Sequence, residues 1–307
     1  MRNPVLRALL LVGSTEGVRG LVMVLTNVHL ARTLGERDFG IIGFAQSIYV
    51  YAALLGNFGL EWIGSRLAAQ HAHPEQAKVG TIFAVRLVTC SSALLLMLGF
   101  CAVSGQPHET KVAILAWALT ISALPILVDW YFYGKQNVGV FVVGRVAGQA
   151  ILLISVLVFV RPDSSLALYP LLFGISTFAQ TLYFLIAFLR IGGSLRPRLA
   201  GSDVRTLLFS SGTFFLSLVC TQVLQNVSFI VLGFGGTERS LGHYTAAHRL
   251  AFGVFSALAT VLGQALFPVL SRQFSDSVAA AVRTMRVYWA LGLAGSITVA
   301  VIGVELS

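Results

Sequence analysis

Apolar residues recur along the chain in long blocks that are separated by short polar breaks. About 20 such residues cross the ~30 Å hydrocarbon layer of a bilayer as a helix, whereas a barrel strand needs only ~10 residues with a period of two. Because the blocks are continuous rather than alternating, the pattern predicts an all-α, polytopic membrane protein. The nine predicted spans lie at roughly 5–31, 39–60, 77–103, 111–133, 138–160, 166–189, 205–234, 242–270 and 284–304.

The composition agrees with this fold class and excludes a soluble protein. Of the 307 residues, 56% are hydrophobic and only 11% are charged, whereas soluble domains carry roughly 25% charged residues. A chain of this length with so few charges cannot cover a water-facing surface. Pro125, Pro170 and Pro268 lie in or near spans and predict kinks, which membrane helices tolerate where neighbours satisfy the freed carbonyls.

The net charge is +9, and the basic residues lie mostly in short loops beside the apolar blocks. They do not alternate with aromatic residues on a polar face, so we expect no nucleic-acid partner. With a cytoplasmic N-terminus, twelve basic residues fall inside and five outside, which is the bias of the positive-inside rule. The inside residues are Arg2, Arg7, Arg66, Lys78, Lys135, Arg190, Arg196, Arg198, Arg205, Arg272, Arg283 and Arg286, and the outside residues are Arg32, Arg37, Lys111, Arg161 and Arg239.

A basic connection at 191–204 divides the chain into two parts. We expect a cytoplasmic linker here, between a six-helix N-terminal lobe (1–190) and a partial C-terminal lobe of three helices (205–307). The sequence LARTLGERDFG at 30–40 is weakly repeated as LGFGGTERSLG at 232–242, an offset of 202 residues. This parity indicates two halves in the same orientation, as in transporters built from parallel repeats. The second half then lacks its last three helices.

The segment 30–66 carries a dense pattern of glycine, leucine and aromatic residues. Its distinctive positions are Leu30-Ala31-Arg32, Leu34-Gly35, Phe39-Gly40, Phe44-Ala45, Tyr51, Phe58-Gly59-Leu60, Gly64 and Arg66. This pattern resembles the N-terminal signature of the polysaccharide and O-antigen flippases, within the multidrug, oligosaccharidyl-lipid and polysaccharide (MOP) exporter superfamily. DWYFYGKQNVG at 129–139 and LGHYTAAHRL at 241–250 are similar to later parts of that family. Asn57 departs from it, because the family usually carries Asp before Phe-Gly.

The resemblance implies two six-helix lobes around a central cavity in the bacterial cytoplasmic membrane. It implies a transporter rather than an enzyme, with an undecaprenyl-diphosphate-linked oligosaccharide as substrate and membrane lipids as surroundings. Polysaccharide polymerase and glycosyltransferase partners would belong to the same assembly route, and no cofactor is implied. Alternating access would move the substrate from the cytoplasmic to the periplasmic leaflet.

Four arginines lie within predicted spans, at Arg19, Arg86, Arg145 and Arg249. A charge in a span costs about 2.5–3.5 kcal/mol on insertion scales and is a functional hypothesis by default. Arginine stays charged and binds phosphate through a fork of donors, which suits a diphosphate. The four arginines are therefore candidate substrate-binding residues, although snorkelling to an interface remains the alternative for the last three.

The amides of Gln222 and Asn226 are four residues apart in the seventh span and share a helix face. They would either bind sugar hydroxyls in a polar cavity or bond one helix to another. Both residues are candidate substrate-binding residues.

Two carboxylates are candidates for an ion pair or for ion coupling. Glu16 precedes Arg19 by three residues and lies one helical turn away. It either neutralises Arg19 or acts as a proton-coupling site. Asp129 near the end of the fourth span would pair with Lys135 or Arg145, or would couple transport to an ion.

Two other functions are compatible with parts of the pattern. A MATE-like exporter of drugs or small cations should favour acidic residues in its spans, whereas arginines outnumber carboxylates here. A membrane enzyme of polysaccharide assembly should carry a large loop or paired carboxylates, and the longest loops hold about 16 residues without such a pair. Neither Cys90, Cys101 and Cys220 nor the histidines have metal-ligand spacing, and no P-loop is present.

Overall fold

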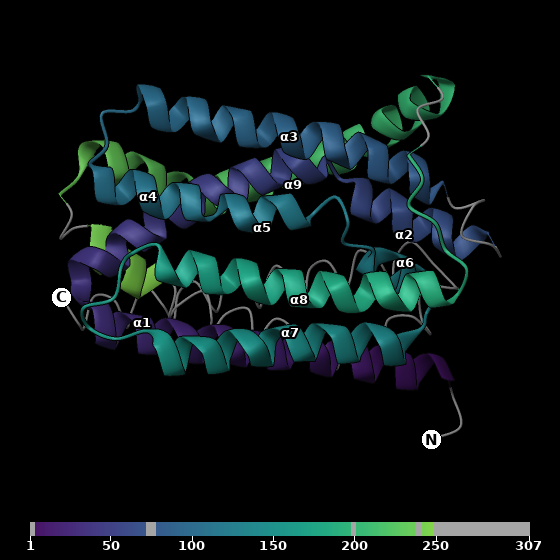
Figure 1. Cartoon of the computed structure of the whole chain (residues 1–307), viewed down its shortest axis with the longest axis horizontal. Coiled ribbons are helices and arrows are strands. Elements are labelled where there is room, and N and C mark those ends of the chain that lie inside the picture. Colours follow the sequence, from purple (N-terminus) through teal and green to yellow (C-terminus); the bar gives the residue numbers. More distant parts are fainter. Residues whose placement is uncertain (1–3, 72–77, 198–200, 238–240, 249–307) are drawn as a thin grey trace, which may run out of the picture. The chain divides into compact units, whose positions relative to one another are not determined.

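The residues that the computed structural model describes are 4–71, 78–197, 201–237 and 241–248 (Figure 1). Backbone contacts divide the chain into two units. The first unit comprises 1–24 and 247–307, and its described part is mainly the start of the first helix. The second unit, 25–246, contains the polar network and the helix contacts analysed below.

The segment labelled α1 (Pro4–Asn57) contains the first two predicted spans as two helices that meet at a break at Gly35. Gly35 has φ 77° and ψ 176°, a conformation that a residue without a Cβ adopts at little cost. A turn at Phe58 and Gly59 then leads into α2 (Leu60–Gln70). The polar break between the first two apolar blocks is therefore a sharp bend at Gly35 between two directly successive helices.

The third span is the single helix α3 (Val79–Val103), but the fourth span is broken into three pieces. These pieces are α4 (His108–Ala116), α5 (Ala118–Ala123) and α6 (Asp129–Gly134). Pro125 lies in the gap between α5 and α6, where it can neither donate a backbone hydrogen bond nor continue the helix. The kink expected at this proline is thus a complete interruption.

Helices α7 (Val138–Phe159) and α8 (Leu168–Arg190) form an antiparallel pair that lies side by side in Figure 1. Glycine allows their close approach, because a Cβ on Gly144 would lie 2.5 Å from the ring of Phe184. One turn further on, Gly148 is crowded in the same way by α8. The Gly-x-x-x-Gly spacing here serves helix packing, as in other membrane bundles.

Helix α9 (Gly201–Gly235) follows the predicted linker, and residues 241–248 begin a further helix. These two elements match the seventh span and the start of the eighth. The ninth span lies outside the described residues. The division into lobes at 191–204 remains a prediction.

An aromatic cluster ties α1 to the broken fourth span and to α8. The ring of Tyr49 stacks on that of Trp117 with 4.3 Å between centroids, and Phe173 and Tyr169 contact the indole from α8. Trp117 is fully buried, at the junction between α4 and α5. Aromatic contacts of this kind therefore hold the short pieces of the fourth span in the bundle.

Five described helical stretches are long and apolar enough to cross a membrane. They are Gly17–Asn57, Val79–Val103, Val138–Phe159, Leu168–Arg190 and Asp203–Gly235. Large apolar side chains such as Leu95 and Leu96 on α3 are exposed in the chain alone, which suits a surface that faces lipid. Since the described residues form helices and no strand, the predicted all-α, polytopic membrane fold is confirmed.

Candidate functional site

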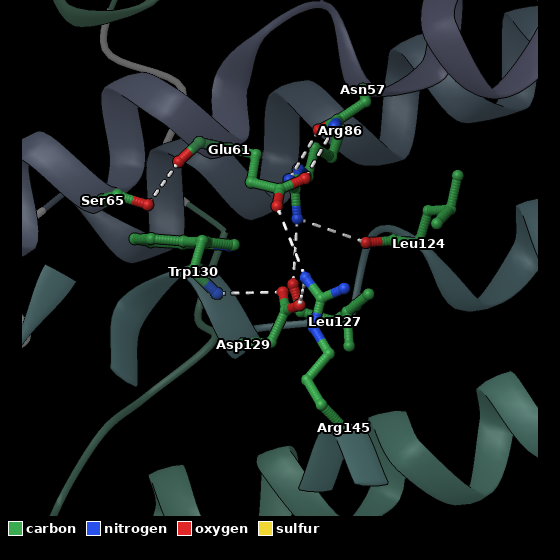
Figure 2. A network of polar contacts seen from close by, with 9 residues as sticks. All are labelled: Asn57, Glu61, Ser65, Arg86, Leu124, Leu127, Asp129, Trp130 and Arg145. Atoms are coloured by element: carbon green, nitrogen blue, oxygen red, sulfur yellow. Dashed lines mark hydrogen bonds and ion pairs between the residues drawn. The ribbon is translucent and has the colours of Figure 1, made fainter. Parts of the chain in front are cut away.

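Polar side chains from five helices meet in one network inside the second unit (Figure 2). Its members are Asn57 at the end of α1, Glu61 on α2, Arg86 on α3, Asp129 at the start of α6 and Arg145 on α7. Two arginines and two carboxylates therefore lie together among otherwise apolar helices, and their formal charges cancel.

Arg86 is the innermost cation, with 3% of its surface exposed. Its Nη2 donates to Oδ1 of Asn57 over 2.6 Å. Its Nη1 donates to the carbonyl oxygen of Leu127 over 2.9 Å and more weakly to that of Leu124 over 3.4 Å. These carbonyls lie in the interruption around Pro125, so the guanidinium satisfies backbone groups at the point where the helix is broken.

Asp129 is 2% exposed and is held from two sides. Its Oδ2 lies 2.8 Å from Nη2 of Arg145, and its Oδ1 accepts a hydrogen bond of 2.9 Å from the backbone N–H of Trp130. The sequence indicated Lys135 or Arg145 as partner, and the structure contains the pair with Arg145. Lys135 instead donates to the carbonyl oxygen of His71.

The outer edge of the network is formed by Glu61 and Arg145. Oε2 of Glu61 accepts a hydrogen bond of 3.1 Å from Nδ2 of Asn57, and its Oε1 lies 3.8 Å from Nη2 of Arg145. The exposed fractions are 38% for the Glu61 side chain and 22% for the Arg145 side chain, and the guanidinium also lies over the ring of Phe141. Arg145 is therefore the more exposed of the two arginines in the network.

Asn57 links the cationic and the anionic side chains of the network. Its carbonyl oxygen accepts from Arg86 and its amide nitrogen donates to Glu61, so one neutral side chain joins a cation to an anion. An aspartate, usual at this position in the family that the sequence resembles, could make only the first contact and would add a third negative charge. The departure noted in the sequence thus coincides with a charge-neutral network.

Of the other predicted site residues, Gln222 and Asn226 form a separate polar pair on α9. Asn226 donates to Oε1 of Gln222 over 2.8 Å on α9, and Tyr51 of α1 donates to the backbone oxygen of Gln222. Glu16 and Arg19 belong to α1 in the first unit. Arg249 lies outside the described residues.

Sequence reasoning missed Glu61 as a member of the site and assigned Asn57 no definite role. Both are four residues apart on either side of the turn at Phe58 and Gly59. In the sequence, the only sign of this site was a carboxylate four residues after an amide at the edge of an apolar block. The two side chains form a site only because Arg86 and Arg145 approach them from other helices.

Within the part of the chain that the structure describes, no group of three or more His, Cys, Asp or Glu side chains is arranged to hold a metal ion. The network therefore consists of hydrogen bonds and ion pairs among side chains and backbone carbonyls. Such an arrangement can bind or exchange charged groups.

Comparison with known proteins connects this fold with transporters. A sequence model of the family described as "Polysaccharide biosynthesis protein" matches residues 6–274. The chain is similar to two proteins described as "Putative O-antigen transporter". The Escherichia coli protein is 23% identical over 262 residues, which cover 83% of this chain and 62% of that protein. The Shigella dysenteriae protein is 23% identical over 273 residues, which cover 86% of this chain and 67% of that protein.

The chain thus spans less than two thirds of the length of the Escherichia coli relative. Among solved structures, the MATE multidrug transporter DinF-BH has a similar fold, with a TM-score of 0.54 at 14% identity. That match covers 86% of this chain and 66% of the other. At this identity the likeness concerns the fold alone.

Proposed function

Because this chain belongs to the polysaccharide biosynthesis protein family, we propose that it is a flippase for a lipid-linked oligosaccharide in the bacterial inner membrane. Its substrate is an oligosaccharide carried on a prenyl diphosphate, and it moves between leaflets by alternating access without any covalent step. The family, the O-antigen transporters among its relatives and the five apolar helices support a transporter rather than an enzyme.

The observation that carries the substrate class is the more exposed guanidinium of Arg145 at the edge of a buried, neutral network. Asp129 holds one side of this guanidinium at 2.8 Å, while Glu61 lies further away at 3.8 Å and is more exposed. A phosphate oxygen that displaced Glu61 would meet a positioned donor. Arg145 thus binds the diphosphate, and Glu61 occupies this position when no substrate is bound.

Arg86 has a different task in this proposal. It is buried and holds Asn57 and the carbonyls of Leu124 and Leu127, so it positions the network instead of contacting substrate. With the N-terminus in the cytoplasm, the network lies toward the cytoplasmic ends of α3 and α7. This is the leaflet from which the substrate is taken.

The other candidate residues complete the pathway. Gln222 and Asn226 bind sugar hydroxyls from α9, while Arg19 and Arg249 provide further contacts for the diphosphate. Glu16 and Asp129 are the carboxylates available for coupling to an ion gradient. A multidrug exporter that binds organic cations would instead need an uncompensated carboxylate, whereas Asp129 is buried against Arg145 and the more exposed Glu61 lies beside Arg145 and Asn57.

Binding to the purified chain tests this proposal. Native mass spectrometry would compare a prenyl-diphosphate-linked oligosaccharide, bare prenyl phosphate and an organic cation. We expect retention of the first ligand, and Arg145→Ala should weaken it by about tenfold or more, since a hydrogen bond to a charged group contributes about 1.5–3 kcal/mol.

Arg196→Ala, an exposed arginine of the predicted linker, is the matched control and should leave binding unchanged. Preference for the organic cation, or equal binding by Arg145→Ala and the parent protein, would contradict the proposed substrate site. A thermal-unfolding curve for each variant separates lost binding from lost folding.

A further inference from the structure

The two copies of the weak sequence repeat contact each other in the folded chain. Gly242 follows Gly40 by 202 residues, the offset of the repeat. A Cβ on Gly40 would lie 2.7 Å from the backbone nitrogen of Gly242, and a Cβ on Gly242 would collide with the carbonyl oxygen of Glu36. The backbones of two equivalent positions therefore touch, and both positions require glycine.

A second equivalent pair lies one helical turn further along. Thr245 follows Gly43 by the same 202 residues, and a Cβ on Gly43 would lie 3.3 Å from the Cβ of Thr245. Thr245 is fully buried in this contact. Positions three residues apart share one face of a helix, so the two repeats meet face to face along corresponding residues.

Contacts of a residue with its own equivalent have a geometric meaning. In a two-fold arrangement a residue touches its mate only near the axis, as in isologous interfaces between subunits. Two successive pairs of this kind place the pseudo-two-fold axis between α1 and the helix that begins at 241. In transporters built from repeats, the substrate site lies at the interface between the repeats.

Further contacts lie at the same end of the second unit as the Gly40–Gly242 contact. Gln106, in the connection between α3 and α4, donates to the carbonyl oxygen of Gly233 over 3.2 Å, and Gly233 lies directly against the ring of Phe44. Glu36 and His243 lie 3.3 Å apart, and both side chains are more than half exposed. The positive-inside pattern assigns this end to the periplasm.

We propose that Gly40 and Gly43 of α1, with Gly242 and Thr245, form the periplasmic seal of the transport pathway. This inference rests on the proposed function and adds the element that must open for release. Backbone contacts through glycine pack tightly when the helices meet and leave no long side chains to disentangle when they separate. The exposed Glu36–His243 pair contributes little to the stability of the closed seal, as is usual for surface ion pairs.

A disulfide measures this contact directly. Gly43→Cys with Thr245→Cys should cross-link readily, because the 3.3 Å between the Cβ positions is close to the ~3.8 Å typical of disulfides. The background carries Cys220→Ser, since Cys220 is exposed whereas Cys90 and Cys101 are buried. Gly139→Cys with Thr245→Cys is the control pair, because Gly139 lies at the other end of the bundle, and it should not cross-link.

Opening of the seal is tested with the same cysteine pair, in membranes that contain the protein, by adding the prenyl-diphosphate-linked oligosaccharide. We expect cross-linking to slow by about tenfold if the ligand moves the closed population by an order of magnitude. Unchanged cross-linking while the ligand binds would overturn the seal. If the ligand does not bind the parent protein at all, the proposed function fails, and the seal is then decided by the next experiment alone.

That experiment needs no substrate. The thiol of Thr245→Cys should resist a membrane-impermeant maleimide, and Gly40→Leu should make it reactive by preventing closure. Gly99→Leu, where a Cβ meets nothing within 4 Å, is the control and should leave it protected. A thiol that reacts equally in all three proteins would show that no seal exists there.

Discussion

Arg145 and Asp129 form an ion pair of 2.8 Å between α7 and α6, with the carboxylate nearly buried and the guanidinium at the edge of the network. The second carboxylate, Glu61, approaches the same Nη2 only to 3.8 Å. The two carboxylates beside this guanidinium thus differ in distance from it and in exposure. This asymmetry suits a cation that is held by one carboxylate and remains available to an anionic ligand.

Asp129→Asn should be strongly destabilising. It removes the nearer carboxylate from Arg145, whose side chain is 22% exposed, so the loss should lie at the lower end of the about 3–5 kcal/mol that breaking a fully buried pair typically costs. The double variant Asp129→Asn/Arg145→Gln should recover much of this loss, because neither charge then remains unpaired. Chemical unfolding in detergent measures both effects; additive losses in the double variant would mean that the two side chains do not interact.

Asn57→Asp should destabilise the network by about 1–2 kcal/mol, because an unsatisfied or repelled buried group costs that order of free energy. The new carboxylate keeps the contact with Arg86 but loses its donor to Glu61, which lies 3.1 Å from the present amide. Adding Glu61→Gln should restore stability by supplying a donor. A stable single variant, with no gain from the second substitution, would contradict this role of Asn57.

Gly144→Ala should destabilise the α7–α8 pair by about 1–3 kcal/mol, the usual cost of overpacking. The added methyl group would lie 2.5 Å from the ring of Phe184, in a tightly packed contact. Gly139→Ala on the same helix meets nothing within 4 Å and should be neutral or slightly stabilising. Thermal unfolding of both variants checks the difference, and equal behaviour would exclude close packing at Gly144.

Lys78→Ala should change stability by less than about 1 kcal/mol, as for other exposed ion pairs. Lys78 lies 2.7 Å from Asp203 at the start of α9, but both side chains are more than a third exposed. The small effect should disappear in high salt because the pair is screened. Comparing the variant with the parent protein at low and high salt provides the measurement, and a loss as large as that of Asp129→Asn would be unexpected.

The sequence indicated most of the helices because the bilayer sets their length and apolar character. It also indicated that Asp129 would pair with a nearby cation and that Pro125 would kink its span, where the structure has a full interruption. It did not indicate that Arg86 would satisfy the carbonyls around that interruption. Arg86 is about 40 residues from Leu124 and Leu127, and helical periodicity carries no information on contacts at that distance.

Length, hydropathy and loop charge by themselves determined an all-helical membrane protein, because each helix must satisfy its own backbone in lipid. They also made the arginines inside spans candidates for function. Only the tertiary structure decided that Arg86 is buried and that Arg145 is more exposed, since Asn57, Glu61 and Asp129 contact these two arginines from different helices. Likewise, the repeat was visible as a sequence offset, but the contact of Gly40 with Gly242 depends on how the two helices pack.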